Sequence, residues 1–358
     1  MSFFTPIRAS NALATEASVP KIAVFVGGTD GIGKATLRAL VSKGFPIKVY
    51  IVGRNEAGHR ALLDELRGLN PKADLVYVQG QISLVADSQR IAKHISAQED
   101  KIDLLFLSAG YLPFTGRQGK YLERSFSKTS EGLEASQAVS YYSHIVFVTY
   151  LLPQLRAAAK ASLSARVINV LAAGQESTNL FLDDLTLKHP GRFSIPTYAA
   201  HAATMVTLTL KRISEAPENK DVVFIHSHPG RVSTDLFMKS WAGKFEPSKA
   251  PPAPPPGTFV ELTAEESGER CLYLITSAEF GGNGVPVQDG RQPASTLAHG
   301  LRGSLFSIDD KFVVLQQDDL LAELDNMEAP QKIWDHTLEA IHAITQQDQI
   351  RVATLPFL

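Results

Sequence analysis

Short apolar runs alternate along this chain with longer stretches in which apolar residues recur at helical spacing. Many of the short runs carry β-branched residues and end at turn residues, which is typical of buried strands in a parallel sheet. The predicted strands are 22–26, 47–52, 74–78, 103–107, 166–171, 222–226 and 304–308. The predicted helices are 35–43, 56–69, 84–95, 131–159, 198–213, 265–276 and 331–344. Strands that alternate with helices predict an α/β fold, a doubly wound parallel sheet (Rossmann fold) of about seven strands.

The pattern divides the chain into three parts of one domain. Residues 1–20 mix polar and apolar positions and are predicted to form a flexible N-terminal arm. Residues 21–310 hold the predicted sheet and the helices around it, the main body of the domain. Residues 311–358 are predicted to be a C-terminal helical extension of the same domain. No internal repeat or second Rossmann unit is apparent.

A proline-rich stretch interrupts the last third of the domain. Residues 245–258 contain six prolines, at 247, 251, 252, 254, 255 and 256. Proline lacks a backbone N–H, so this stretch cannot continue a helix or a sheet ladder. We interpret it as a semi-rigid loop beside a substrate cleft, in an extended C-terminal substrate-loop region. The alternative is a ligand for small proline-recognition domains.

Net charge, cysteine content and the length of the apolar stretches indicate which kinds of partner and compartment to expect. The formal net charge is −2 and the pI is near 6.6, so there is no basic surplus for nucleic acid or anionic lipid. The single cysteine, Cys271, rules out an intrachain disulfide and fits a reducing compartment. Residues 1–20 show no secretory signal, and the longest apolar stretch, 145–152, is too short to span a bilayer. We therefore expect a cytoplasmic protein that binds neither nucleic acid nor membrane.

The turn between the first strand and the first helix is the most informative stretch. It carries glycines at 27, 28, 31 and 33. A strand, a glycine turn and a helix bring backbone N–H groups and a helix N-terminus onto a phosphate, and glycine lets that phosphate approach closely. This context predicts a nucleotide cofactor. The alternative is a tight turn without a ligand.

The sequence Gly27-Gly28-Thr29-Asp30-Gly31-Ile32-Gly33 resembles the cofactor turn of the short-chain dehydrogenase/reductase family. Ser108-Ala109-Gly110 resembles the family's turn after the fourth strand, and 228–234 is similar to its segment that meets the nicotinamide. The resemblance covers roughly residues 20–310 and implies an NAD(P)-binding domain. It implies cofactor contacts from Gly27, Thr29, Gly31, Ile32, Gly33, Lys34, Arg54, Ser108, Gly110, Val232 and Thr234.

Charge favours NADP(H) over NAD as the cofactor. Family members selective for NAD usually place an acidic residue at the end of the second strand. Here that place reads Gly53-Arg54, and Lys34 follows the last glycine of the turn. Two cations and no carboxylate suit a 2′-phosphate, which arginine can meet bidentately. The alternative is that both cations are solvated surface charges.

The resemblance is weaker at the catalytic positions. Tyr198 matches the family's proton-donating tyrosine, but Ala202 stands where the lysine four residues on is expected. Ala172 replaces the serine after the fifth strand, and Ser140 replaces the asparagine of the long helix. His201 shares a helix face with Tyr198 and is a candidate substitute for the lysine, the alternative being a packed or surface histidine.

These departures resemble a divergent subgroup common among fungal oxidoreductases, many of them tied to secondary metabolism. His226 and His228 lack a third ligand at zinc spacing, so no metal is predicted. The resemblance implies an oxidoreductase that reduces a ketone or enone on a small hydrophobic metabolite. The alternatives are a non-redox isomerase, dehydratase or cyclase, and a cofactor-binding scaffold without turnover.

Assembly is a further expectation. The stretch 145–152 and the helix after Tyr198 are apolar on more than one face. The family's dimer helices have the same property. We therefore expect a homo-oligomer formed through these two helices.

Overall fold

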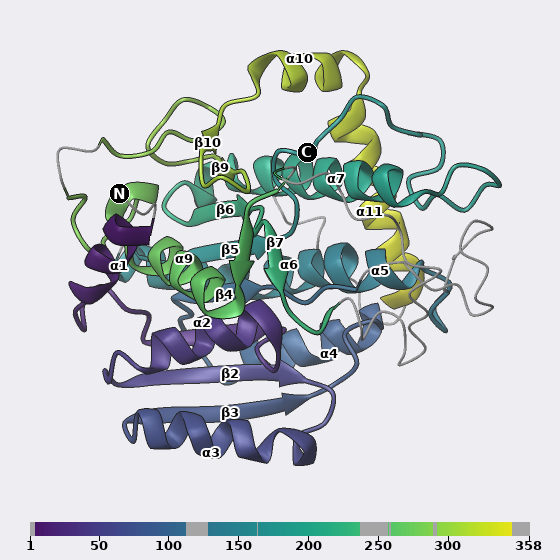
Figure 1. Cartoon of the computed structure of the whole chain (residues 1–358). Coiled ribbons are helices and arrows are strands. Elements are labelled where there is room, and N and C mark those ends of the chain that lie inside the picture. The colour runs from purple at the N-terminus through teal and green to yellow at the C-terminus, as the bar shows by residue number, and fades with distance from the viewer. Residues whose placement is uncertain are drawn as a thin grey trace.

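An eight-stranded sheet runs through the centre of the molecule (Figure 1). The computed structural model describes residues 4–111, 128–162, 164–236, 257, 259–288 and 292–345. The strands are β1 (Ile22–Val26), β2 (Ile47–Gly53), β3 (Ala73–Gln79), β4 (Leu104–Leu107), β5 (Arg166–Val170), β6 (Val223–Ser227), β9 (Leu305–Ile308) and β10 (Val314–Leu315). Their order is β10-β9-β6-β5-β4-β1-β2-β3, parallel except for β10. The predicted doubly wound parallel sheet is confirmed, with one antiparallel edge strand more than expected.

Helices cover both faces of this sheet, and the strands supply alternate residues to two cores. One face carries α1 (Phe4–Ala12), α2 (Gly31–Val41), α3 (Arg60–Leu69) and α9 (Ala264–Thr276). The other carries α4 (Val85–Ser96), α6 (Ser143–Ser162), α7 (Ile195–Ser214) and α11 (Ala329–Thr345). In β1, Ala23 and Phe25 face the first core while Val24 and Val26 face the second. This two-sided burial explains the nearly continuous apolar strands. Among the described residues, no helix is both long and apolar enough to cross a membrane.

The N-terminal segment differs from the flexible arm predicted for 1–20. Residues 4–12 form α1, which packs against α9, and Ile7 and Asn11 are buried. The Asn11 amide donates to the backbone oxygen of Glu269 at 2.9 Å and to its carboxylate at 2.6 Å. The helix has a weak apolar face of its own. Its order comes from a partner more than 250 residues away, which local sequence patterns do not reveal.

The helix predicted over 131–159 is present but interrupted. Its first turn is α5 (Ala135–Gln137), followed by a π-helical turn over Ala138–Tyr142 and then by α6. Glu134 caps the start of α5, because its carboxylate accepts the Gln137 N–H at 2.8 Å. A π turn adds a residue to the helical turn, and such turns occur frequently at functional sites. Pro153 lies inside α6 without ending it.

The C-terminal segment adds two helices to the second core. Helix α10 (Asp318–Asn326) leads into α11, which packs against α7 and α4. Tyr141 Oη lies 2.8 Å from Thr209 Oγ1 of α7 and 2.6 Å from Thr337 Oγ1 of α11. Tyr142 Oη lies 2.6 Å from His336 Nε2. Helix α11 therefore anchors the π turn. The helical extension predicted over 311–358 also contains strand β10, and its residues 346–358 lie outside the described residues.

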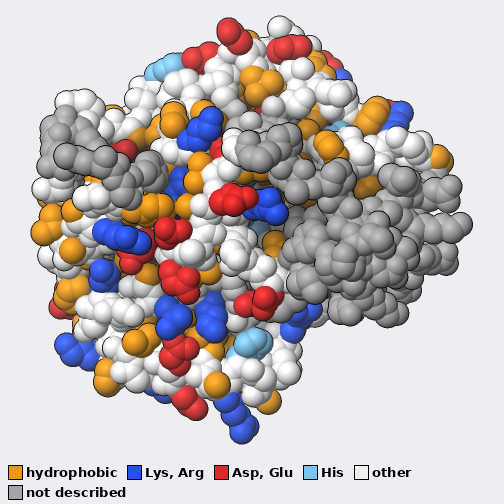
Figure 2. Space-filling model, viewed as in Figure 1, with side chains coloured by type: hydrophobic (Ala, Val, Ile, Leu, Met, Phe, Trp, Pro, Cys, Tyr) orange, Lys and Arg blue, Asp and Glu red, His pale blue; other side chains and the backbone are white. Residues whose placement is uncertain are grey.

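A second, two-stranded sheet lies outside the main one. Short strands β7 (Arg231–Ser233) and β8 (Glu261–Thr263) pair in parallel outside the main sheet. The proline-rich loop predicted over 245–258 lies, apart from Gly257, outside the described residues. On the face shown in Figure 2, acidic and basic side chains are interspersed over the described surface.

Candidate active site

The glycine turn joins β1 to α2 at the carboxyl edge of the sheet. Gly27 has φ of +100° and Gly31 has φ of +52°, which are conformations that glycine adopts without strain. A Cβ on Gly27 would lie 2.5 Å from the backbone N of Ala109. A Cβ on Gly33 would lie 2.2 Å from the Gly27 carbonyl oxygen and 2.5 Å from Ser108 Oγ. The sequence at 27–33 therefore has glycine where a side chain has no room.

Neighbouring turns surround the glycine turn. The backbone N–H groups of Ser108 and Ala109, after β4, both donate to the Val26 carbonyl at 3.0 Å. A Cβ on Gly31 would lie 3.3 Å from the Thr234 methyl group, so the segment after β7 reaches the first turn of α2. The structure thus brings together segments from three parts of the chain.

The remaining predicted cofactor residues lie around this centre. Ile32 and Lys34 belong to the first turn of α2 and are half-buried. Val232 lies in β7, two residues before Thr234. Gly110 is exposed, and an added Cβ there would meet no atom within 4 Å.

The end of β2 lies beside the glycine turn. A Cβ on Gly53 would lie 2.1 Å from the Tyr77 hydroxyl and 2.8 Å from the Thr29 methyl group. The Tyr77 hydroxyl also accepts the Asn55 N–H at 3.2 Å. Arg54 is exposed next to this contact. Within the described part of the chain, neither Arg54 nor Lys34 forms an ion pair with a carboxylate.

Tyr198 lies in the first turn of α7 beneath a small apolar cluster. Ser194 caps this helix by accepting the Thr197 N–H at 3.1 Å. The Tyr198 ring is 6% exposed and packs with Leu187 and with Leu171, which follows β5. Because β5 and β1 are parallel, Tyr198 and the glycine turn lie at the same edge of the sheet.

The Tyr198 hydroxyl forms a hydrogen bond with the Ser140 hydroxyl. Tyr198 Oη lies 2.9 Å from Ser140 Oγ, and Ser140 itself donates to the Ser136 carbonyl at 2.7 Å. With the serine proton used in that way, the tyrosine is the donor between the two hydroxyls. Ser140 and Tyr198, both predicted as site residues, are brought together by the π turn.

Glu134 belongs to the same buried group and was not among the predicted residues. Burial raises the pKa of the Glu134 carboxyl, and only the Gln137 N–H and the nearby Ser136 oppose this. Burial first, and then the Glu134 charge, raises the pKa of Tyr198 above its ordinary value, while Ser140 and Ser136 act in the opposite direction. Tyr198 is therefore a neutral phenol at neutral pH. The signal in the sequence was an acidic residue just before an apolar helical run, which indicates a helix cap rather than a site.

His201 does not take the place of the missing lysine. Its Nε2 accepts the Phe181 N–H at 3.1 Å, and the ring is fully buried. Burial lowers the pKa of His201 to about 4, so the ring is neutral near pH 7. A neutral imidazole supplies no positive charge to Tyr198. The geometry favours the packed histidine over the catalytic one.

The loop after β5 is fixed by a second buried network. His226 Nε2 accepts the Ala172 N–H at 3.2 Å, so Nδ1 carries the proton and donates to Thr207 Oγ1 at 2.8 Å. Thr207 in turn donates to Glu176 at 2.5 Å. Burial raises the pKa of Glu176, but His226, Thr207 and Gln317 together hold it below its ordinary value. This network holds the backbone at Ala172, where the family places a serine.

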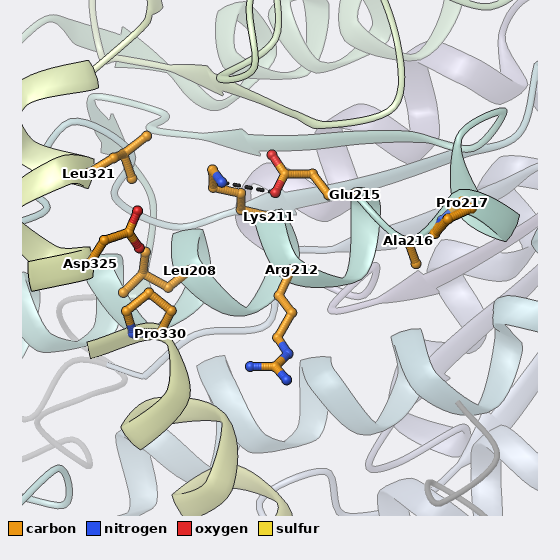
Figure 3. Close-up of a pocket in the computed structure, with 9 residues that line it drawn as sticks. All are labelled: Leu208, Lys211, Arg212, Glu215, Ala216, Pro217, Leu321, Asp325 and Pro330. Atoms are coloured by element: carbon orange, nitrogen blue, oxygen red, sulfur yellow. Dashed lines mark hydrogen bonds and ion pairs between the residues drawn. The ribbon is translucent and has the colours of Figure 1, made fainter. Parts of the chain in front are cut away.

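A cavity of about 300 Å³ lies at the other end of α7 (Figure 3). Leu208 and Arg212 of α7 line it together with Leu321 of α10 and with Pro330. Arg212 follows Tyr198 by 14 residues, which is about 20 Å along a helix. This cavity is therefore separate from the tyrosine. The described residues contain no group of three or more histidine, cysteine, aspartate or glutamate side chains that could hold a metal.

Comparisons with known proteins point to one family. A family model described as short chain dehydrogenase matches residues 21–181. Oxidoreductase AN1596 of Emericella nidulans is 33% identical over 348 residues, which cover 92% of this chain and 95% of that protein. Oxidoreductase andH of Emericella variicolor is 32% identical over 96% of this chain and 98% of its own length. The fold is similar to that of an NADPH-bound carbonyl reductase from chicken fatty liver, with a TM-score of 0.52, 18% identity, and coverage of 82% of this chain and 98% of that chain.

Proposed function

Because the chain belongs to the short-chain dehydrogenase family, we propose that it is an NADP(H)-dependent oxidoreductase that reduces a ketone or enone on a small hydrophobic molecule. The two fungal oxidoreductases compared above are more than 30% identical to it, in line with the divergent fungal subgroup. The observation that carries the proposal is the Tyr198 hydroxyl, buried on Ser140 at the same edge of the sheet as the glycine turn. The single cysteine fits work in a reducing compartment such as the cytoplasm.

The glycine turn fits a dinucleotide. Gly27 and Gly33 let the turn pack closely against Ser108 and Ala109, and the N-terminus of α2 favours a negative charge. Thr29 belongs to the turn, and Thr234 lies beside it at Gly31. We assign the pyrophosphate of the cofactor to this cradle.

The end of β2 supports NADP(H) over NAD(H). The Tyr77 hydroxyl fills the space that a side chain at position 53 would need, so an acidic residue cannot stand there without moving the ring. Arg54 is exposed and makes no ion pair with the described carboxylates, which leaves it available for a 2′-phosphate. Lys34, at the start of α2, adds a second cation.

Tyr198 is suited to donate a proton rather than to remove one. Bound NADPH would supply the hydride that reduces the substrate carbon. Tyr198 keeps its proton at neutral pH because burial raises its pKa. A neutral phenol can protonate a developing alkoxide but is a poor base toward an alcohol. Activity should therefore run as reduction near pH 7, with oxidation weak until the pH is much higher.

The first test measures NADPH consumption with hydrophobic ketones and enones. Tyr198→Phe should abolish consumption, while NADPH binding followed by cofactor fluorescence stays unchanged. Tyr150→Phe is the matched control, because Tyr150 lies on α6 and contacts Gln89 of α4. A Tyr198→Phe protein with full activity would contradict the proposed role. NADPH binding without consumption by the wild type would favour the non-redox alternative.

The second test measures cofactor preference. A charge-assisted hydrogen bond to phosphate contributes about 1.5–3 kcal/mol, so Arg54→Ala should weaken NADPH at least several-fold and leave NADH nearly unchanged. Arg67→Ala is the control, because Arg67 is exposed on α3 and pairs with Asp64. Equal losses for both cofactors would show that Arg54 acts through folding instead.

A further inference from the structure

A carboxyl group for which the described residues offer no cationic partner is buried near the proposed proton donor. Glu134 is 1% exposed, and one of its oxygens, Oε1, has no hydrogen-bond partner within the described part of the chain. The ionisable groups on which it acts are Tyr198 on α7 and Tyr142 in the π turn. No cation contributes to the pKa of Glu134 or of Tyr198 among the described residues. A buried, uncompensated carboxyl has a strong tendency to hold its proton.

One hydroxyl, that of Ser136, is near both groups. Ser136 is buried, and its Oγ completes no hydrogen bond of ordinary geometry. The same hydroxyl is close enough to affect the pKa of both Glu134 and Tyr198. Rotation about its Cα–Cβ bond would bring Oγ toward either neighbour. Buried polar atoms without partners are uncommon in proteins, and Glu134 Oε1 and Ser136 Oγ are two of them.

We propose that Glu134 is the proton reservoir for Tyr198 and that Ser136 carries the proton between them. This inference rests on the proposed reductase activity and names the route by which the donor regains its proton. Ser140 has a different task, because its proton is already given to the Ser136 carbonyl and its oxygen holds the tyrosine hydroxyl in place.

Each group in the relay that gives up a proton receives another one. When Tyr198 protonates the substrate oxygen, its O–H bond breaks and a phenolate remains. The Ser136 proton passes to the phenolate, and the Glu134 proton passes to Ser136. Glu134 is left as a carboxylate and regains a proton from water near Gly132, which is exposed two residues away. No electron moves in this relay, so it needs no further reactant.

The structure offers variants that separate the relay from helix capping. In Glu134→Gln the side-chain oxygen can still accept the Gln137 N–H, but the proton reservoir is lost. Ser136→Ala removes a hydroxyl that makes no hydrogen bond of its own, so the fold should be retained. Glu134→Asp keeps a titratable carboxyl at the cap. Tyr150→Phe again serves as the control on α6.

The first measurement is kcat for carbonyl reduction as a function of pH. The second, made without cofactor, is the ultraviolet titration of Tyr198, obtained by subtracting the titration of Tyr198→Phe from that of the protein with Tyr198. Glu134→Gln and Ser136→Ala should each lower kcat by about 10-fold or more with the KM for NADPH unchanged. The wild type should lose kcat as the pH rises through the raised pKa of Glu134, and both variants should lack this step. Glu134→Gln should also make Tyr198 titrate at lower pH, since a negative charge is removed.

Several results would overturn the relay. Wild-type kcat and pH dependence in Ser136→Ala would exclude Ser136 as the carrier. Glu134 would be only a helix cap if Glu134→Gln behaved like the wild type. The same would follow if Glu134→Gln and a well-folded Glu134→Asp lost kcat equally. A wild type that reduces no carbonyl would instead contradict the proposed function. The Tyr198 titration would then still test whether Glu134 and Tyr198 interact. An unchanged Tyr198 titration in Glu134→Gln would contradict that interaction.

Discussion

Gly33 shows how little freedom single residues have in the cofactor turn. Its missing Cβ would lie 2.2 Å from a backbone oxygen, which belongs to a turn fixed by the strand before it. Overpacking of this kind typically costs about 1–3 kcal/mol and shifts the backbone. The spacing of the glycines in the sequence therefore reports a real contact between α2 and the end of β1.

We expect Gly33→Ala to weaken NADPH binding at least about 10-fold and to lower the free energy of unfolding by about 2 kcal/mol. Gly68→Ala is the matched control, because Gly68 lies in α3 and an added Cβ there meets nothing within 4 Å. That control should be neutral or stabilising by up to about 1 kcal/mol, since alanine favours a helix. Fluorescence titration with NADPH and urea unfolding measure both effects. Equal NADPH affinity in the two variants would contradict this account of the turn.

Sequence patterns found the residues whose position is set locally, and missed those set by three-dimensional contacts. The glycines follow a strand end and Tyr198 lies at a helix start, as predicted, whereas their roles were inferred from the family resemblance and stay predictions. Glu134 and Ser136 belong to the site only because the π turn and α7 meet at Ser140. Lys34 and Arg54 remain predictions until cofactor binding is measured.

At the level of whole elements, the π turn depends on α11 for its place. The Tyr141 hydroxyl is fully buried between Thr209 of α7 and Thr337 of α11. Periodicity predicted the helices around it to within a few residues but gave one continuous helix over 131–159, since a single added residue in a turn leaves no clear mark on an apolar pattern. Tertiary hydrogen bonds of this kind cannot be read from local spacing.

Tyr141→Phe should lower the free energy of unfolding by about 1–3 kcal/mol, because it leaves the Thr209 hydroxyl buried without a partner. Tyr150→Phe should cost less, since its partner Gln89 lies nearer the surface. Urea unfolding at an unchanged m-value measures the difference. If the two variants lose the same free energy, the link between α7, α11 and the π turn contributes little to stability.

The same element bears on assembly. Ile145, Phe147 and Leu151, which suggested an oligomer interface, are 0–2% exposed within a single chain. Helix α11 also lines the space beside Ile145 through Trp334. The homo-oligomer stays a prediction, and light scattering of the full chain at micromolar concentration would test it. A second copy would have to use the outer face of α11 or another surface.

For the molecule as a whole, two buried histidines couple stability to pH. Burial lowers the pKa of His144 and of His201 to about 4, from an ordinary value of 6.5. Between about pH 4 and pH 6.5 the unfolded chain therefore binds more protons than the folded chain, so the free energy of unfolding rises with pH in this range. Above about pH 6.5 the free energy of unfolding is not reduced by these histidines. As the pH falls toward 4, it decreases by roughly 3 kcal/mol for each histidine.

We expect the free energy of unfolding, measured in urea, to fall between pH 6.5 and pH 4. His201→Gln should make this fall less steep, because a glutamine oxygen can still accept the Phe181 N–H without taking up a proton. His299→Gln is the control, since His299 is an exposed ring beside Asp318. A pH dependence that is unchanged in His201→Gln would mean that another group accounts for the acid sensitivity.

The position of α11 also has a consequence for biosynthesis. Helix α6 is complete at Ser162, whereas α11 begins at Ala329. At the usual speed of a ribosome this separation corresponds to roughly 10–30 s of translation. During that time the part of α6 that Trp334 later approaches, around Ile145, has no α11 to cover it. The nascent chain therefore presents an apolar patch to holding chaperones, and that patch closes when α11 docks.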